Sequence, residues 1–194
     1  MLERAGFQVV GEAANGREAL AEALRLRPEV VVMDIGMPEL NGVDATRQLT
    51  AELPATKVVA LTMSADRHYV FAMLDAGARG YLLKNAAADE LLSALTAVMQ
   101  GQTYLSPAIA GCVAYRVSGG RAHEAAGRPL SSRERQVLQL IAEGKTSKEV
   151  AADLGIAVPT VETHRRQIME KLALRTVAEL TKYAIREGLT SADQ

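Results

Sequence analysis

Short apolar runs alternate with helix-length segments over the first hundred residues, and this alternation limits the possible folds more than any other feature of the chain. Residues 30–33 are three valines and a methionine, a run typical of a strand buried on both faces. Further strands are expected at 7–11, 58–61 and 80–83. Helices are expected from Asn15 to just before Pro28 and at 43–52, 65–75 and 89–99. Strands that alternate with helices predict a parallel sheet covered by helices on both faces.

The pattern changes beyond residue 106. Residues 108–117 predict one more helix, and residues 118–129 have the composition of a flexible linker. No strand pattern follows the linker. Four helices are expected there, at 131–143, 146–154, 159–172 and 176–187, and the first two begin with capping boxes. We therefore expect an α/β domain at 1–105, a connecting helix and linker at 106–129, and an all-α domain at 130–194.

The composition is that of a globular protein, with 48% hydrophobic and 23% charged residues. No apolar stretch approaches the roughly 20 residues that span a membrane, so a cytoplasmic protein without membrane contact is expected. The single cysteine, Cys112, has no partner for an internal disulfide. Residues 1–127 carry 11 Lys and Arg against 14 Asp and Glu, whereas residues 128–194 carry 11 against 9. This asymmetry suggests that the second domain is the one that meets a polyanion.

Polar residues follow the expected strands at the points where these end. Asp34, Thr62 and Lys84 occupy these positions in three successive strands. In open parallel sheets the carboxyl ends of strands form the functional edge. A carboxylate there can act as a nucleophile toward phosphorus, with the ammonium and hydroxyl groups binding phosphoryl oxygens. The alternative is that each residue is simply a polar side chain at a strand end.

The residues around these strand ends resemble the receiver domain of two-component response regulators. The resemblance covers residues 1 to about 105 and rests on 34–42 (DIGMPELNG), on Leu61-Thr62 and on 80–84 (GYLLK). It implies a flavodoxin-like, doubly wound parallel sheet, a partner sensor histidine kinase and a bound Mg²⁺. It also implies that Asp34 is the phospho-acceptor, and that Thr62, Tyr81 and Lys84 respond to the phosphoryl group.

The chain departs from this family before Phe7. Such receivers begin with a strand that ends in two acidic residues, and the chain has no such strand and no acidic pair there. Mg²⁺ would therefore keep only Asp34 and the backbone near Gly36, a weak site. The residues from Met1 to Gly6 fit the end of the first receiver helix. We accordingly expect that some twenty or more residues are absent from this sequence.

The helix expected at 159–172 has one polar face. Val161, His164, Ile168 and Leu172 recur at helical spacing and are expected to face inward. The outward residues have the length and chemistry to contact base edges: Glu162, Thr163, Arg166 and Gln167. Three further cations, Lys148, Arg165 and Lys171, can reach phosphates. The alternative is a small helical bundle with a solvated charged face.

Motifs in this domain resemble the LuxR-type helix-turn-helix of the NarL/FixJ class of response regulators. They are 130–138 (LSSRERQVL), 148–151 (KEVA), 160–164 (TVETH) and Lys171-Leu172. The resemblance implies that the third helix, with Thr160 in its first turn, enters the major groove of DNA. It also implies a homodimer on paired half-sites, in which Val177, Leu180 and Ala184 of the last helix meet their copies. Ala157 stands where the family usually has a serine N-cap.

The leading hypothesis is a DNA-binding transcriptional regulator, not an enzyme, that is controlled by phosphorylation at Asp34. A regulator of the same architecture that works without phosphorylation is the first alternative. An aspartyl-phosphate hydrolase would commonly have a second acid two residues after the nucleophile, where this chain has Gly36. A protein-interaction module with a vestigial helical domain is the third possibility, and DNA binding would count against it.

Overall fold

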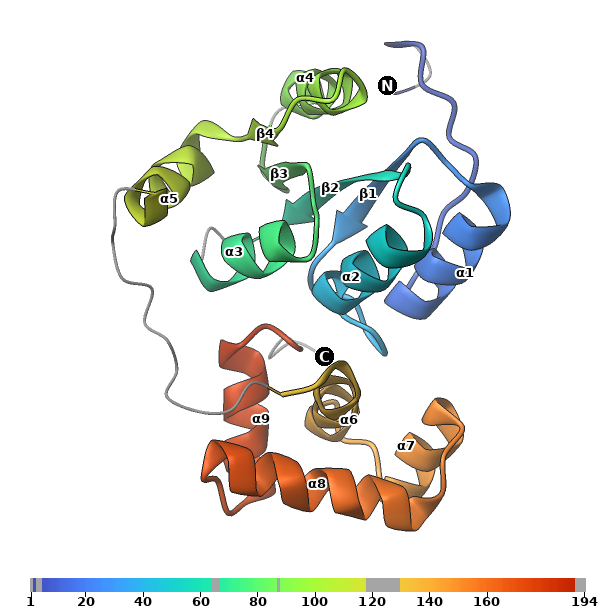
Figure 1. Ribbon diagram of the computed structural model, residues 1–194, viewed down its shortest axis with the longest axis vertical. Coiled ribbons are helices and arrows are strands. Elements are labelled where there is room, and N and C mark those ends of the chain that lie inside the picture. Colours follow the sequence, from blue (N-terminus) through green and yellow to red (C-terminus); the bar gives the residue numbers. More distant parts are fainter. Residues whose placement is uncertain (1, 3–4, 64–66, 87, 118–129, 191–194) are drawn as a thin grey trace.

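The computed structural model describes residues 2, 5–63, 67–86, 88–117 and 130–190, which form an α/β unit and a helical unit (Figure 1). The α/β unit is built on a four-stranded parallel sheet with the order β1-β2-β3-β4. Its strands are β1 (Val30–Asp34), β2 (Lys57–Thr62), β3 (Gly80–Leu83) and β4 (Tyr104–Leu105). The register pairs Asp34 with Leu61 and Thr62 with Leu83.

Helices cover both faces of this sheet, as the sequence predicts (Figure 1). One face meets α1 (Gly16–Leu26), α2 (Gly42–Glu52) and α3 (Arg67–Asp75), with α5 (Pro107–Val117) beside α3. The other face meets α4 (Ala88–Met99). Alternate residues of β2 enter the two cores, since Val58 and Ala60 pack on the α2 side and Val59 packs with Leu95 of α4.

The strand expected at 7–11 is not formed. Residues 7–13 lie outside any helix or strand, and residues 8–14 are all exposed. A strand needs a neighbour to satisfy its backbone groups, and no described strand lies beside this segment. β1 is consequently an edge strand, and Val32 on it is 39% exposed, with Val9 and Val10 at 46% and 48%. Of the helix end expected at 1–6, residues 1, 3 and 4 lie outside the described residues.

The helical unit contains the four predicted helices. They are α6 (Ser132–Ala142), α7 (Ser147–Leu154), α8 (Val158–Leu172) and α9 (Val177–Arg186). The predicted capping boxes of α6 and α7 are both present, with Ser131 and Thr146 as N-caps, and Thr176 forms another at α9. Apolar residues from all four helices form one core, which includes Val137, Val150, Val161, Ile168 and Leu180.

The helical unit lies below the sheet in the view of Figure 1, with α6 toward the α/β unit and α8 on the far side. Residues 118–129, between the two units, lie outside the described residues. Within the described ranges, every helix is too short or too polar to cross a membrane.

Candidate functional site

Three polar side chains lie together where β1, β2 and β3 end. Asp34 is the last residue of β1, Thr62 is the last of β2, and Lys84 directly follows β3. Lys84 Nζ is 2.5 Å from Asp34 Oδ2, and the Lys84 backbone N–H donates to the Thr62 carbonyl at 2.6 Å. The structure therefore brings the carboxylate, the hydroxyl and the ammonium group to one edge of the sheet, because parallel strands end on the same side.

The Asp34 carboxylate can be reached from solvent. The side chains of Asp34 and Lys84 are 31% and 35% exposed, whereas Thr62 is buried at the rim. Tyr81 is fully buried and belongs to the same core as Val70 of α3. An accessible carboxylate beside an ammonium group has the geometry to accept a phosphoryl group, since the cation offsets the charge of the phosphoryl oxygens.

Residues 35–41, which we call the acceptor loop, begin and end against Asp34. The Gly36 N–H donates to Asp34 Oδ1 at 3.3 Å, and the Gly42 N–H donates to the Ile35 carbonyl at 2.9 Å. A Cβ on Gly42 would lie 1.9 Å from the Asp34 carbonyl oxygen. At the end of the loop Asn41 caps α2, since its Oδ1 accepts from the Asp44 N–H at 3.0 Å. The acceptor loop therefore has little freedom to move without moving Asp34.

The donor atoms at this edge do not fit a tightly held Mg²⁺. Asp34 Oδ2 faces Lys84 Nζ, and Asp34 Oδ1 accepts from the Gly36 backbone. In the described part of the chain, no three His, Cys, Asp or Glu side chains come together as metal ligands. Mg²⁺ requires near-octahedral oxygen coordination. The site of Asp34 and Gly36 that the resemblance implies is thus short of strong ligands among these residues.

Helices α7 and α8 form the predicted helix-turn-helix. Gly155 ends α7 in the left-handed conformation, with φ 62, which glycine adopts without strain. Ala157 precedes α8 and makes no side-chain capping bond, and Pro159 lies in the first turn. Val161 and Ile168 face the domain core, so the opposite face of α8 is turned outward.

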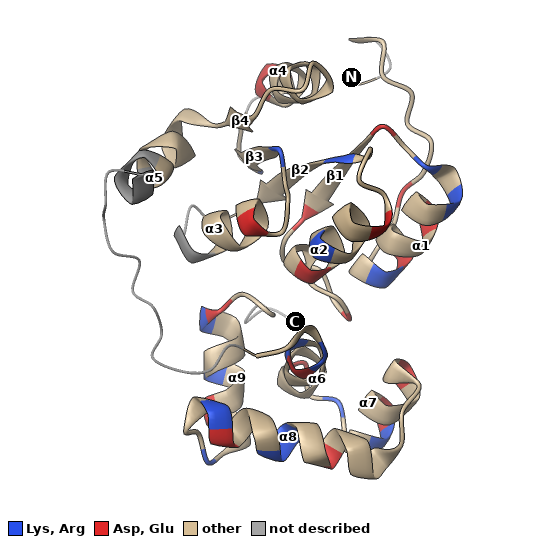
Figure 2. Ribbon diagram, viewed as in Figure 1, with Lys and Arg blue, Asp and Glu red and all other residues tan. Residues whose placement is uncertain are grey.

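The outward face of α8 presents polar side chains to solvent. Glu162, Arg166 and Gln167 are exposed there, as the sequence predicts, and so are Thr160 and, on α7, Lys148. Glu162 is held from both sides: it accepts from the Ser147 hydroxyl at 2.5 Å and lies 3.9 Å from Arg165. Basic and acidic residues therefore alternate along this helix (Figure 2).

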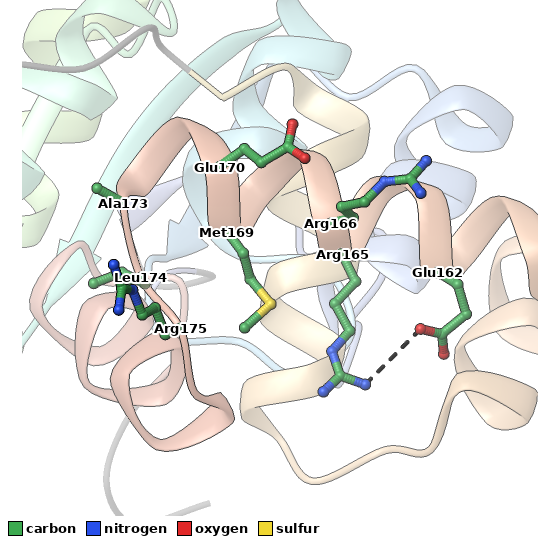
Figure 3. A pocket seen from close by; sticks show the side chains of 8 residues that line it. All are labelled: Glu162, Arg165, Arg166, Met169, Glu170, Ala173, Leu174 and Arg175. Carbon is green, nitrogen blue, oxygen red and sulfur yellow. Dashed lines mark ion pairs between the residues drawn. The ribbon is translucent and has the colours of Figure 1, made fainter.

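A shallow hollow lies along the second half of α8 (Figure 3). Arg165 and Met169 point to one side of the helix there, and Arg166 and Glu170 point to the other (Figure 3). The residues that line it are Glu162, Arg165, Arg166, Met169, Glu170, Ala173, Leu174 and Arg175. The sequence pattern does not single out Arg175, because this residue follows the end of the helical pattern. Arg175 lines the same hollow as Arg165 and Arg166 and adds a third cation to this surface.

Two of the side chains expected to contact DNA are engaged within the helical domain. Lys171 Nζ is 2.7 Å from Glu134 Oε2, and the Glu134 side chain is only 4% exposed. Burial raises the pKa of Glu134, but hydrogen bonds from Lys171 and Ser131 outweigh it and hold that pKa below its usual range. The Thr163 hydroxyl donates to the Pro159 carbonyl at 2.9 Å. Lys171 thus pairs with a buried carboxylate of its own domain, and its contact with a DNA phosphate stays a prediction.

The residues of α9 that are expected to mediate dimerisation differ in their exposure to solvent. Leu180 and Ala184 are fully buried in the core of the helical unit, where α9 packs on α6. They cannot meet a second copy unless the domain opens, so this part of the expectation is wrong. Val177 is 41% exposed and remains available. An amphipathic helix has one apolar face, and here most of that face meets the domain's own core.

Sequence reasoning missed a set of contacts between α6 and the acceptor loop. Gln139 is fully buried, and its side chain bonds to Met37 and Asn41 of the loop. Arg135, one turn earlier, pairs with Asp44 of α2 at 2.7 Å. The available signal was a glutamine within the apolar run of residues 137–141. A glutamine at such a position is equally compatible with exposure to solvent on the helix surface.

Comparisons with known proteins agree with both units. The family model for the response regulator receiver domain matches residues 1–96, and the model for bacterial regulatory proteins of the luxR family matches residues 128–184. The transcriptional regulatory protein MctR of Rhizobium johnstonii is 39% identical over 185 residues, which cover 95% of this chain and 84% of MctR. The oxygen regulatory protein NreC of Staphylococcus carnosus is 38% identical over 189 residues, covering 94% and 87%.

Solved structures give the same result. RcsB from Salmonella enterica serovar Typhimurium, bound to promoter rprA in the presence of phosphomimetic BeF3-, matches with a TM-score of 0.58 and 26% identity. The match covers 91% of this chain and 84% of that one. With an accessible Asp34 at the sheet edge and an outward-facing α8, the chain belongs to the two-component response regulators that join a receiver domain to a LuxR-type helix-turn-helix.

Proposed function

We propose that the chain regulates transcription by binding paired DNA half-sites as a homodimer, and that a sensor histidine kinase controls it by phosphorylating Asp34. The observation that carries this proposal is the 2.5 Å pairing of Lys84 Nζ with Asp34 Oδ2, in the same chain as an α8 whose polar face is turned to solvent. We assign the receiver to residues 1–105 and the DNA reader to 130–194. A regulator of this kind works where the DNA is, in the cytoplasm.

The DNA contacts follow from the chemistry of the exposed face. Arg166 can bond to guanine O6 and N7, and Glu162 can accept from the amino group of cytosine. Lys148, Thr160 and Arg165 have the length and chemistry to contact phosphates, and Arg175 extends this set. The helical domain has only a small excess of basic residues, so affinity depends on the pairing of two copies.

Phosphorylation is tested by incubating the full chain with acetyl phosphate and Mg²⁺ and separating the phosphorylated form by electrophoresis. Labelling that is lost in Asp34→Asn and kept in Asp89→Asn is expected, because Asp89 is an exposed carboxylate on α4. Absence of labelling in the wild type, with DNA binding intact, would instead establish a regulator that works without phosphorylation.

DNA reading is tested by selecting bound sequences from a random pool and measuring affinity by fluorescence anisotropy. Arg166→Ala and Glu162→Ala are expected to relax the selected sequence, each at its own base pair, by about 1–3 kcal/mol. Lys182→Ala is the control, because Lys182 is exposed on α9, away from the proposed base-reading face of α8. Unchanged sequence preference in both α8 variants would show that α8 is not the recognition helix.

A further inference from the structure

The acceptor loop is held by a residue of the other domain. Gln139 of α6 accepts from the Asn41 backbone N–H at 2.9 Å and from Asn41 Nδ2 at 3.1 Å. The Gln139 amide also donates to the Met37 carbonyl at 3.1 Å. One side chain therefore satisfies backbone groups of the third and the last residue of the loop. Because Gln139 and Asn41 are almost fully buried, each of these bonds replaces one that water would otherwise make.

An ion pair lies beside these hydrogen bonds. Arg135, one turn before Gln139, donates through Nη2 to Asp44 Oδ1 at 2.7 Å and through Nε to the same oxygen at 3.0 Å. The Asp44 side chain is 1% exposed and also pairs with Arg47 of its own helix. A carboxylate this deeply buried is strongly disfavoured without its cations. We call Arg135 and Gln139, with their partners Asn41 and Asp44, the latch.

Further contacts continue the interface on both sides of the latch. The Tyr69 hydroxyl of α3 donates to the Ile185 carbonyl at the end of α9, at 3.1 Å. Arg17 of α1 donates to the Asp153 carbonyl at the end of α7. None of these contacts involves the outward face of α8, which lies on the far side of the helical unit (Figure 1). The docked arrangement thus leaves the recognition face open.

The latch is connected to the Asp34 carboxylate by a short series of backbone contacts. The Asn41 backbone N–H donates a hydrogen bond to Gln139. The N–H of the next residue, Gly42, donates to the Ile35 carbonyl, and Gly42 packs against the Asp34 carbonyl. Gly36, at the start of the loop, donates to the Asp34 carboxylate itself. A displacement of the loop at Asn41 would therefore reposition the groups that surround Asp34.

We propose that Gln139 and Arg135 of the DNA-binding domain are positioning residues of the Asp34 site, which hold the acceptor loop in place while the recognition helix stays open. Domain docking and the reactivity of Asp34 are then coupled in both directions, since linkage is reciprocal. The role of Asp34 rests on the proposed function. The positioning of the loop does not, and it can be measured separately.

The experiment is hydrogen exchange of the 35–42 segment in the full chain, together with small-angle scattering, for wild type, Gln139→Leu and Gln136→Leu. Gln136 is the matched control, because it lies on the same helix and bonds within it to Arg133. Gln139→Leu is expected to speed exchange of the 35–42 segment about tenfold and to enlarge the radius of gyration. Gln136→Leu should change neither quantity. Equal exchange in all three proteins would overturn the proposal.

A second pair of variants protects the test against simple misfolding. Asp44→Asn and Arg135→Met break the same contact from opposite domains, and each is expected to loosen the loop. The double variant should loosen it no further than the stronger single variant, whereas additive effects would show that the two residues do not act through one latch.

Acetyl phosphate labelling then reports on the Asp34 site. If wild type is labelled, Gln139→Leu is expected to change the labelling rate several-fold and Gln136→Leu to leave it unchanged. An identical rate in all three proteins would overturn the positioning role. If wild type is not labelled, phosphorylation of Asp34 fails as a function, and the exchange data alone decide whether the latch holds the loop.

Discussion

The Cα atom of Gly42 packs directly against the carbonyl oxygen of Asp34, so that a Cβ at position 42 would lie 1.9 Å from that oxygen. The obstacle is backbone, which cannot rotate away as a side chain can. Asp34 and the first turn of α2 are consequently joined as closely as two backbone segments allow, and the acceptor loop between them has a fixed length and path.

Gly42→Ala is expected to destabilise the α/β unit by about 2 kcal/mol or more, because the backbone must move to admit the methyl group. Gly36→Ala in the same loop is the control, since a Cβ there would meet nothing within 4 Å. Urea unfolding followed by far-UV circular dichroism gives both values. Equal midpoints for the two variants would contradict this description of the loop.

Glu143 is expected to stabilise the folded chain more at low pH than at high pH. Burial raises the pKa of Glu143, at the end of α6, although hydrogen bonds from Gln139 and the Glu39 backbone and the nearby charge of Lys145 act against this. An acid with a raised pKa in the folded chain binds protons more readily there than in the unfolded chain, so its contribution to stability is present at low pH and is lost as the pH rises through the folded-state pKa.

Urea unfolding measured between pH 4 and 8 tests this dependence. Glu143→Gln should be at least as stable as wild type at pH 8, and its free energy of unfolding should change less with pH than that of wild type. If the variant is instead less stable than wild type at pH 8, the carboxylate form of Glu143 is the one that stabilises the fold, and its contribution must weaken as the pH falls.

The two ends of the apolar face of α9 should respond differently to truncation. Leu180→Ala is expected to cost about 2–5 kcal/mol of stability, because Leu180 is fully buried in the domain core. Val177→Ala should stay within about 0.5 kcal/mol, since Val177 is 41% exposed. Thermal unfolding measures the stability of both variants, and sedimentation equilibrium shows which variant alters dimerisation. A loss of pairing in Val177→Ala, at unchanged stability, is the expected signature of an interface residue.

Helix α8 begins without a side-chain cap, so a capping residue at position 157 should increase the stability of the DNA-binding domain. Ala157 has the extended conformation of an N-cap, with φ -72 and ψ 145, but no oxygen to accept from the first turn. Ala157→Ser is expected to stabilise the helical unit by about 0.5–2 kcal/mol. Hydrogen exchange of α8 amides measures the gain. Ala152→Ser, in the interior of α7, should bring none, because serine there has no cap to form.

The sequence was sufficient to predict β1, β2, β3 and the helices because their signals are local: β-branched runs, capping boxes and one apolar face per helix. It predicted the meeting of Asp34, Thr62 and Lys84 because parallel strands end at one edge. The strand expected at 7–11 was wrong for a non-local reason, since backbone pairing depends on a neighbour and not on the residues of the strand itself.

The latch and the inner face of α9 could not be predicted for a related reason. The patterns around Gln139 and Leu180 predict only that one face of each helix is buried. Which surface covers it depends on how separate units dock, and no local pattern encodes that. The ion pair of Lys171 with Glu134 could not be predicted either, because the two residues lie far apart in the sequence.

In a polypeptide of residues 1–194, the side of β1 away from β2 has no described strand beside it. Val32 on this strand is exposed, and so are Val9 and Val10 in the extended segment 8–14. Free strand edges that carry apolar side chains pair with one another. Self-association through this edge would rise with total protein concentration and would ignore the operator sequence. In solution, a dimer of the 194-residue polypeptide is therefore evidence of regulation only when the presence of cognate DNA changes its amount.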